Sequence, residues 1–525
     1  MKKIVLATGV VALGLLASCS NDAPVVIPDD STVNGDYRYI AVNIATTSNT
    51  RASSGDRFEG DKDERAIHSA TLYLVDSDNE ENVIMARTFN AGYDGSKQEG
   101  KPAETTISFP VAADYFKSLT ENAGNANKKY KLYIVANAES NGFVMNKFNL
   151  DEIVEKTAWG SGDKPGQLGR PGYFYMSNDD EIEVSLPAYD ATGLQNGSSD
   201  ANAWPINVNN KVVLTRLAAR FDLKIDAQPY SYAINEAGDE ATFTITGAGL
   251  QHKNTVSYLF RHMSPTGTTD KVVVFGRGDD MHLVTPHGSW YGKTCDPMES
   301  CDYKTDLTAY KGTDPDKFDY GFESAINGIA TKDSPEEVKK ELVSYKNVTY
   351  MAFRAEFKYP GWTEGGKEFA TYHGEIVGTL EEMTSPDFLP SHMSDENRPY
   401  VVNTLNELRN QDGGLDISTE ALRKAFIETL RHKDFDYFTP EADGSYLCYY
   451  MTPLFNDVDD SETLDFCCKY RVRRNRLYNM DLESIHKIGR DGEFVPDPII
   501  VEETKWIDLN VEIKDWQIVN NSFVF

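Results

Sequence analysis

The sequence predicts a mostly β protein built from two β-sandwiches, and three observations support this. Segments with an apolar residue at every second position recur along the chain and are bounded by Gly, Asn, Asp and Pro, which is typical of half-buried antiparallel strands. Tyr (28), Phe (25) and Gly (38) are abundant, which favours strands over helices. A chain of 525 residues is too long for one ordinary core, so we expect two domains.

The N-terminus predicts an exported lipoprotein. Two lysines precede an apolar run from Ile4 to Leu16, and Leu16-Ala17-Ser18 is a small-residue box in front of Cys19. This order is that of a bacterial lipoprotein signal with Cys19 as the lipidation site. The alternative is a simple cleaved signal peptide in which Cys19 has no role. Residues 20–35 are polar and suit a tether.

The charge balance argues against nucleic acid and anionic membrane surfaces as partners. Lys and Arg number 52 against 82 Asp and Glu, which gives a net charge of −30. Copies of such a protein repel one another as well as polyanions. We therefore expect a soluble surface that needs a specific device to polymerise.

The cysteines predict little chemistry. Five follow Cys19, so they cannot all pair within the chain. Cys295 and Cys301 lie in one polar loop and are candidates for a disulfide in an oxidising compartment. The other three fall on expected strands and are equally compatible with buried thiols. Their spacing matches no zinc or redox motif, so we expect no metal site.

The expected strands follow one another along most of the chain, and two helices interrupt them. One helix is predicted at Ser334, where a capping box carries Pro335 at the first helical position, and one at Ser418 or Thr419. Residues 292–330 are acidic and predict a loop insertion. The expected strands are 69–76, 105–111, 128–138, 181–187, 210–227, 241–250, 254–260, 270–276, 347–360, 444–453, 473–485 and 505–519.

No motif supports catalysis or a cofactor. The nine histidines include no metal-binding pair, and the glycine-rich run at 159–172 lacks the Gly-Lys-Ser/Thr of a phosphate loop. Residues 456–462 lack the central Gly and the distal Glu of a calcium loop. No Gly-x-Ser-x-Gly elbow is present. We therefore expect a non-enzymatic protein without a cofactor.

The two ends of the exported chain carry strand patterns that suit assembly. In the first strand Ile40, Val42 and Ile44 alternate with Tyr39, Ala41 and Asn43, and Arg51-Ala52 follows in a small, polar stretch. A trypsin-like cut after Arg51 would remove this strand and leave an apolar groove. In the last strand the apolar positions are Ile507, Leu509, Val511, Ile513, Trp516 and Ile518.

A strand from another copy would fill the groove by β-strand addition and make a polymer. The cut would at the same time release the chain from the lipid on Cys19. The alternative is that the last strand simply completes its own domain.

Together these features resemble the fimbrillins of type V pili from Bacteroidia, most closely the Mfa-type, or minor, fimbria and its major shaft subunit. The resemblance rests on the lipobox, the first strand with Arg51, Arg216 and Arg220 in the strand at 210–227, and the Arg474-Asn475-x-Leu477-Tyr478 run before the last strand.

The resemblance implies two transthyretin-like antiparallel β-sandwiches, the second with a few short helices. It implies processing at Arg51-Ala52, with Arg57 and Arg65 as rival sites. The domains implied are a signal peptide at 1–18, a lipidated propeptide with the displaceable strand at 19–51, an N-terminal sandwich at 52–226, and a C-terminal sandwich at 227–525 that ends in the donor strand at 506–525.

The function implied is that of a structural shaft subunit that supports adhesion and biofilm formation. Its partners would be further copies of itself, anchor and tip subunits, an Arg-specific protease, and receptors on host or bacterial surfaces. A palmitate-bearing precursor on the outer membrane would become part of an extracellular fimbrium. The alternatives are an anchor or tip subunit, or a surface glycan-binding lipoprotein with Trp290 or Trp362 as its platform.

Overall fold

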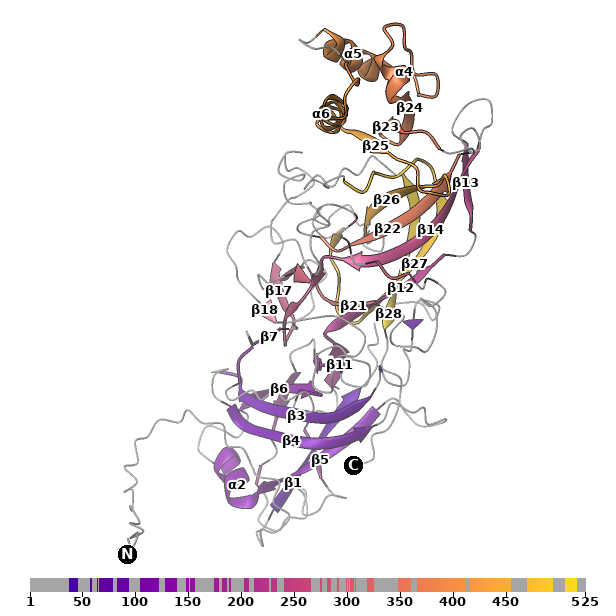
Figure 1. The fold of residues 1–525 in the computed structure, drawn as a ribbon. Helices are drawn as coiled ribbons and strands as arrows, with labels where there is room; N and C mark the ends of the chain where they lie inside the picture. The colour runs from indigo at the N-terminus through magenta and orange to yellow at the C-terminus, as the bar shows by residue number, and fades with distance from the viewer. Residues whose placement is uncertain are drawn as a thin grey trace, which may run out of the picture.

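Two β-sheet bodies and a smaller helical unit follow one another through the molecule (Figure 1). The computed structural model describes residues 37–45, 57–58, 64, 66–78, 83–93, 104–121, 128–138, 148–150, 152–155, 174–178, 182–186, 188–189, 203–206, 212–225, 228–233, 240–265, 274–275, 281–284, 290–291, 299, 301, 303–305, 307, 319–324, 348–359, 366–410, 415–454, 470–493 and 506–516.

The first body is a nine-stranded sheet with the main order β10-β1-β11-β8-β6-β3-β4, in which β5 also pairs with β1 and β9 with β6. Side chains from β1, β3 and β6 meet in one core, which includes Val42, Leu72 and Leu132. Helix α2 (Ala113–Glu121) directly follows β5. The strands are β1 (Tyr37–Ala45), β3 (Ile67–Asp76), β4 (Val83–Tyr93), β5 (Glu104–Ala112), β6 (Lys129–Ala136), β8 (Met176–Asn178), β9 (Ile182–Ser185), β10 (Trp204–Pro205) and β11 (Val212–Arg216).

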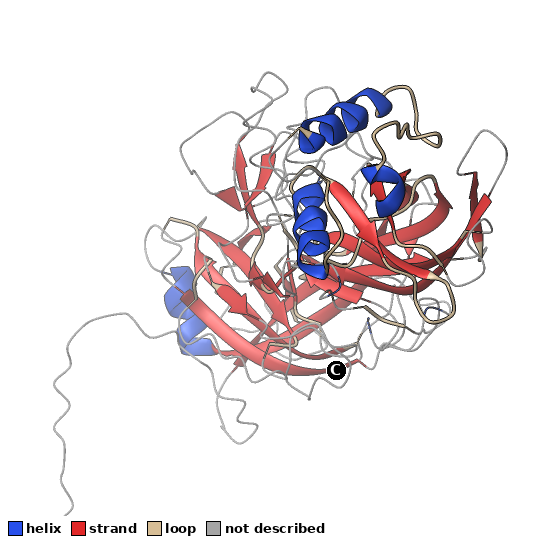
Figure 2. Ribbon diagram, turned by 45° about the horizontal axis from the view of Figure 1, so that its top comes forward, coloured by secondary structure: helices blue, strands red, loops and turns tan. Residues whose placement is uncertain are grey.

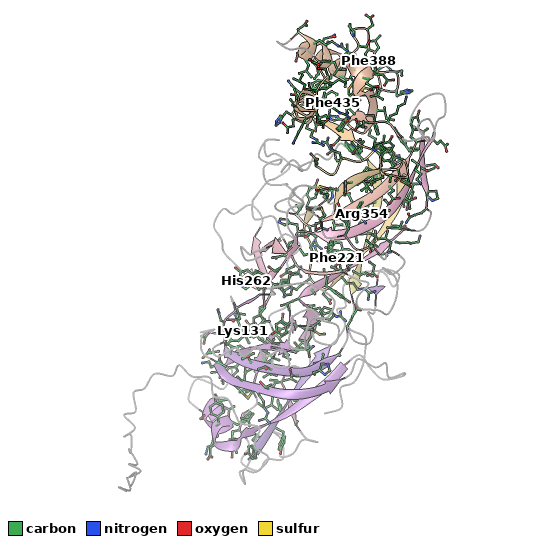
Figure 3. All side chains as sticks on the ribbon, viewed as in Figure 1. Lys131, Phe221, His262, Arg354, Phe388 and Phe435 are labelled. Atoms are coloured by element: carbon green, nitrogen blue, oxygen red, sulfur yellow. The ribbon has the colours of Figure 1, made fainter. Side chains whose placement is uncertain are left out.

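The second body is a sandwich of two sheets with the orders β2-β28-β27-β12-β21 and β13-β14-β22-β26. Phe221 and Met480 from one sheet share a core with Phe243 and Phe357 from the other, and Figure 3 shows Phe221 in this middle region. The strands are β2 (Arg57–Phe58), β12 (Ala218–Lys224), β13 (Tyr230–Ala233), β14 (Glu240–Gln251), β21 (Asp319–Phe322), β22 (Tyr350–Lys358), β26 (Tyr446–Pro453), β27 (Arg476–Ile485) and β28 (Ile507–Trp516).

The strand expected at 210–227 is divided between the two bodies. It breaks at Leu217, so that β11 joins the first sheet and β12 joins the second body. The chain therefore changes sheet at Leu217, before residues 226 and 227, where the sequence places the boundary between the domains. That domain boundary stays a prediction.

The helical unit has a core of its own at the end of the molecule opposite the first sheet (Figure 1), and Figure 2 shows its helices in blue. It contains the sheet β24-β23-β25 and helices α4, α5 and α6. Helix α6 begins where the sequence predicts, because the Thr419 side chain accepts a hydrogen bond from the Leu422 amide. Its elements are β23 (Phe369–Tyr372), β24 (Glu375–Thr379), α4 (Leu380–Thr384), α5 (Arg398–Arg409), α6 (Glu420–Arg431) and β25 (Phe435–Phe438).

The mostly β class, the sandwich and the short helices on the second body are confirmed. The helix predicted at Ser334 lies outside the described residues. The loop predicted over 292–330 is wrong at 319–322, because β21 is a buried strand paired with β12. Most strand pairs are antiparallel, but β1 pairs in parallel with β10 and β11, as β12 does with β27.

Short pairs complete the fold: β7 (Ile153–Glu155) with β16 (Val256–Tyr258), β15 (Lys253–Asn254) with β20 (Trp290–Tyr291), and β17 (His262–Pro265) with β18 (Val274–Phe275) and β19 (Met281–Val284). In the part of the chain that the structure describes, no helix has the length and apolarity to cross a bilayer.

Candidate functional site: the first and last strands

The first strand lies inside its sheet, with a partner on each side. All nine residues of β1 pair antiparallel with β5, from Tyr37 opposite Ala112 to Ala45 opposite Glu104. On its other side β1 runs parallel to β10 at residues 40–41 and to β11 at residues 44–45. Removing β1 would therefore open two strand edges at once.

The predicted inward side chains of this strand are buried in the first core. Ile40 is 1% exposed and Val42 is fully buried. Ile44 is described through its backbone, which pairs with Val212 and Thr105. Each buried aliphatic side chain contributes about 1.5–3 kcal/mol, so a chain without β1 would expose an apolar groove.

A cation on the same face of β1 is a feature that sequence reasoning missed. Arg38 is buried, its guanidinium lies 5.2 Å from the centre of the Tyr189 ring, and one of its amino groups is 3.4 Å from the Tyr189 hydroxyl. The sequence could have indicated this cation, because Arg38 is two residues before Ile40 and so points to the same face of the strand. The Lys117 ammonium lies 5.6 Å from the centre of the same ring, so Tyr189 has two cations beside it.

The expected processing site falls mostly outside the described residues. Cys19, Arg51 and Ala52 are not among them, and neither is Arg65. Arg57 belongs to the two-residue strand β2, which pairs in parallel with residues 515–516 of β28.

Glu64 anchors the chain between two candidate cut sites, Arg57 and Arg65. It is 1% exposed, and its carboxylate accepts hydrogen bonds from Arg220 Nη1 (2.8 Å) and the Tyr320 hydroxyl (2.7 Å). Its carbonyl oxygen accepts a hydrogen bond from Arg216 Nε at 2.7 Å. Burial alone would lower the pKa of Arg220, but Glu64 and Asp222 raise it, so the guanidinium stays charged.

The last strand is paired within its own body. β28 runs antiparallel to β27, with Ile507 opposite Ile485 and Asp515 opposite Arg476. Ile507 is 6% exposed, and the half-buried Leu509 and Val511 pack against the second core. Ile513 and Trp516 are described through their backbone, and Ile518 lies outside the described residues. The single chain thus keeps β1 and β28 in different sheets.

Polar contacts hold the start of β28 in this place. Asp508 Oδ2 accepts a hydrogen bond from Ser484 Oγ at 2.8 Å and lies 2.5 Å from His486 Nε2. Just before the strand, the Arg490 guanidinium lies 5.1 Å from the centre of the Trp506 ring. These contacts fix the register of β28 on β27.

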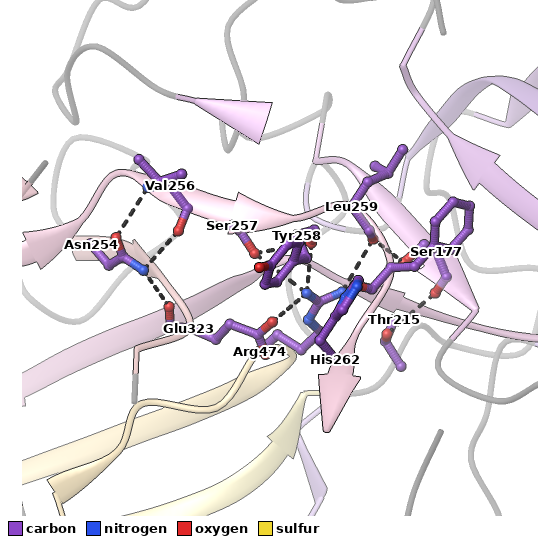
Figure 4. A network of polar contacts seen from close by, with 11 residues as sticks. Ser177, Thr215, Asn254, Val256, Ser257, Tyr258, Leu259, His262, Glu323 and Arg474 are labelled. Carbon is purple, nitrogen blue, oxygen red and sulfur yellow. Dashed lines mark hydrogen bonds and ion pairs between the residues drawn. The ribbon is translucent and has the colours of Figure 1, made fainter. Parts of the chain in front are cut away.

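The Arg-Asn-x-x-Tyr run at the start of β27 builds the junction between the two bodies (Figure 4). The buried guanidinium of Arg474 forms an ion pair with Glu323 and donates hydrogen bonds to the carbonyl oxygens of Tyr258 (2.8 Å) and Leu259 (3.3 Å). Ser177 of β8 donates to the same Leu259 oxygen at 2.6 Å. Strand β8 of the first sheet and Arg474 therefore meet at one carbonyl.

The other residues of that run support the same junction. Asn475 has a left-handed backbone (φ 57°), and its side-chain oxygen accepts a hydrogen bond from Arg216 Nη1 at 3.0 Å. The Tyr478 hydroxyl accepts a hydrogen bond from the Arg473 amide at 2.9 Å, and its ring stacks on Phe221. The run that resembles the fimbrillins therefore makes structural contacts at the junction between the two bodies.

Buried ionisable groups in the described regions are paired or neutral. Burial would raise the pKa of Asp319, but Lys253 and Lys304 lower it to about 2. Burial lowers the pKa of His252 to about 4. No group of three His, Cys, Asp or Glu residues that could hold a metal ion occurs among the described residues. These groups serve the fold rather than a reaction.

Two other predicted features are partly described. Cys301 is in a disulfide whose partner lies outside the described residues, so its pairing with Cys295 stays a prediction. Trp290 is placed by its backbone in β20, and Trp362 lies outside the described residues.

Comparison with known proteins gives one family match. Residues 444–522 match the family model described as "Major fimbrial subunit protein type IV, Fimbrillin, C-terminal". This family consists of structural subunits, which agrees with the expectation of a non-enzymatic protein. A search of curated proteins finds no match.

Solved structures include fimbrial proteins among the similar chains. A fimbrilin from Porphyromonas gingivalis has 11% identity and a TM-score of 0.36, with 92% of this chain and 98% of that chain covered. The tip fimbrial protein Mfa3 from the same species has 11% identity and a TM-score of 0.33, with 91% and 100% covered. Because both TM-scores are below 0.5, we draw no functional conclusion from these likenesses.

Proposed function

This chain carries the C-terminal region of the fimbrillins, and from that premise we propose that it is the shaft subunit of a type V pilus. It is exported as a lipoprotein through Cys19, cut after Arg51, and polymerised by exchange of β1 for the last strand of another copy. The fibre supports adhesion and biofilm formation on the cell surface.

The position of β1 is the observation that carries this proposal. The strand pairs with β5 along its whole length and with β10 and β11 on the other side, and it buries Ile40 and Val42. A strand that is central and apolar leaves a groove that only another strand can fill completely. An arginine lies six residues after this strand in the sequence, at Arg51.

Glu64 favours Arg51 over Arg65 as the cut site. In the sequence Arg65 is flanked by two buried residues, Glu64 and Ala66, whereas proteases prefer exposed loop tips. A cut there would also detach Glu64 and leave Arg220 without one of its two buried carboxylates. Arg57 is paired with β28, which makes it a poorer substrate than an unpaired site.

A shaft role fits better than an anchor or tip role because a shaft subunit must both accept and donate a strand. This chain has a first strand that is followed by a candidate cut site, Arg51, and a last strand with alternating apolar residues. An anchor needs no cut, and a tip needs no donor.

The test is the N-terminal residue of fibres sheared from cells, read by mass spectrometry together with electrophoresis in SDS. We expect Ala52 and a ladder of SDS-resistant multimers that disappears when residues 506–525 are deleted. Arg51→Lys blocks an Arg-specific cut while keeping the charge, and Arg57→Lys and Arg65→Lys are the matched controls. A monomer that still begins at lipidated Cys19 would overturn the proposal.

A further inference from the structure

A row of aromatic and polar side chains lies at one end of the sheet β24-β23-β25. Tyr400 of helix α5 is 45% exposed, and its ring stacks on that of Tyr372 with 4.9 Å between the ring centres. Tyr372 also stacks on His373, with ring centres 4.2 Å apart. His373 Nε2 lies 2.9 Å from Asp434 Oδ2. We call these four side chains the Tyr400 row, and Figure 3 labels Phe435, the residue that follows Asp434.

We propose that the Tyr400 row binds a neutral oligosaccharide. The exposed ring of Tyr400 would pack against the apolar face of one sugar ring. The Asp434 carboxylate would accept hydrogen bonds from sugar hydroxyl groups. The inference goes beyond the proposed function, because a single uncut chain carries the whole row.

The Asp434 carboxylate has room for further hydrogen bonds. Its Oδ1 accepts one from Arg490 Nη2 at 2.7 Å, and its Oδ2 contacts His373 Nε2. A carboxylate offers about four acceptor positions, and 46% of the Asp434 side chain is exposed. Burial would raise the pKa of Asp434, but His373 and Arg490 lower it, so the acceptor is ionised at neutral pH. Neighbouring hydroxyl groups of a sugar are donors that suit the remaining positions.

The polar end of the row is held in place before a ligand arrives. His373 and Asp434 both have left-handed backbones, with φ angles of 49° and 67°, a conformation that non-glycine residues seldom adopt. Next to His373, the Gly374 carbonyl oxygen accepts a hydrogen bond from the Ile488 amide at 3.1 Å. A site that is already ordered loses little conformational entropy when a ligand binds.

Tyr372 connects the two ends of the row. It is 8% exposed, so it supports the Tyr400 ring from beneath. Burial raises the pKa of Tyr372 to about 12, with Tyr400 and Asp434 adding to the effect and Arg490 opposing it. Both ends of the row are therefore electrostatic neighbours of one hydroxyl group. Since Tyr372 and His373 stand between the exposed ring and the carboxylate, we expect a ligand with more than one sugar ring.

The charges favour a neutral ligand. The chain has a net charge of −30, which repels anionic sugars. A cation gains little at Asp434, because the Arg490 guanidinium already neutralises this carboxylate. A sugar hydroxyl needs only an acceptor position. The row belongs to the helical unit, at the end of the molecule opposite the first sheet (Figure 1).

Saturation-transfer NMR with the uncut chain tests the inference. The probes are lactose, maltose, mannobiose and chitobiose, and the comparators are 3′-sialyllactose, which adds a carboxylate to lactose, and trilysine. We expect transfer from the protein to at least one of the neutral disaccharides at millimolar concentration. Transfer to none of the four, or to a comparator alone, would overturn the proposal. The assay needs no cleavage or assembly, so its outcome is separate from that of the shaft proposal.

Substitutions of Tyr400 locate the binding. Tyr400→Ala should lower the affinity about tenfold, because the aromatic contact is lost, whereas Tyr400→Phe keeps the ring and should bind as the unaltered chain does. Leu422→Ala is the control, since Leu422 of helix α6 is also apolar and exposed. If Tyr400→Ala and Leu422→Ala bind the sugar equally well, the sugar binds elsewhere and the proposal is wrong.

Asp434→Asn tests the polar end of the row. Asn tolerates a left-handed backbone and keeps one side-chain oxygen, but loss of the charge should weaken the hydrogen bonds to the sugar and lower the affinity about tenfold. Asp395→Asn is the matched control, because the Asp395 side chain is 97% exposed. Equal affinities of the two variants would contradict the role assigned to Asp434.

Discussion

The carboxylate of Glu64 accepts a hydrogen bond from Arg220 Nη1 at 2.8 Å, and both side chains are almost wholly buried. Glu64 lies between the candidate cut sites Arg57 and Arg65, whereas Arg220 belongs to β12 of the second body. The pair therefore ties the chain at Glu64 to the second body. A buried charge without its partner lowers the stability of the folded protein, so loss of either Glu64 or Arg220 is expected to destabilise it.

Glu64→Gln is expected to lower the free energy of unfolding by about 3 kcal/mol, since Arg220 loses a buried counter-charge. Chemical denaturation followed by tryptophan fluorescence measures this. Glu183→Gln is the control, because the Lys129–Glu183 pair is about half exposed and should contribute below about 1 kcal/mol. Equal losses in the two variants would show that Glu64 is not an anchor.

Ile40→Ala is expected to weaken the precursor and leave the fibre unchanged. The side chain is 1% exposed in the first core, so its truncation costs about 2–5 kcal/mol in the uncut chain. The proposed processing would remove this residue, so SDS-resistant multimers should keep their stability to heat. Thermal unfolding of the precursor tests the expected loss of stability, and heating of the multimers tests whether their stability is unchanged. Weakened multimers would mean that β1 stays in the fibre.

Asp436→Asn is expected to change how stability depends on pH. Burial raises the pKa of Asp436 to about 6, although Arg490 Nη1 lies 3.0 Å away. The unfolded value is about 3.9, so the contribution of this group is fully present below about pH 4 and is lost as the pH rises through 6. Asn cannot ionise, so stability relative to the unaltered protein should rise by up to about 3 kcal/mol between pH 4 and 7.

Thermal unfolding across that range measures the difference between the two proteins. Asp395→Asn is the control, because the Asp395 side chain is 97% exposed. If the difference in stability between Asp436→Asn and the unaltered protein did not change with pH, the raised pKa of Asp436 would be contradicted.

Cys448 is expected to resist thiol reagents until the protein unfolds. It is fully buried, and burial raises its pKa to about 12, so almost no thiolate exists at neutral pH. Alkylation with and without denaturant, followed by peptide mass spectrometry, tests this. Rapid labelling in the native protein would show that β26 opens readily.

The sequence predicts the strands well because alternation is a local property. The first strand is observed at 37–45 and contains the predicted Ile40, Val42 and Ile44. The last strand is observed at 507–516, inside the expected range 505–519. Helix α6 follows from its cap at Thr419, while α5 was missed although Pro399 at its start is a usable signal.

Strand partners and buried charge pairs could not be predicted because they depend on long-range contacts. Nothing near Glu64 in the sequence indicates that it meets Arg220, 156 residues away. The parallel pairing of β1 with β11 is hidden for the same reason. The break at Leu217 was missed because apolar residues continue through it and only the change of neighbours reveals it.

Helices α4–α6 lie in a segment that leaves the sheet after β22 and returns at β26, where Phe357 faces Tyr446. Since the two ends of the segment are neighbours in one ladder, a change in its length costs little loop-closure free energy. The helices share a core separate from those of the two sheet bodies. The helical segment is thus able to change in sequence and length while the β22–β26 ladder is preserved.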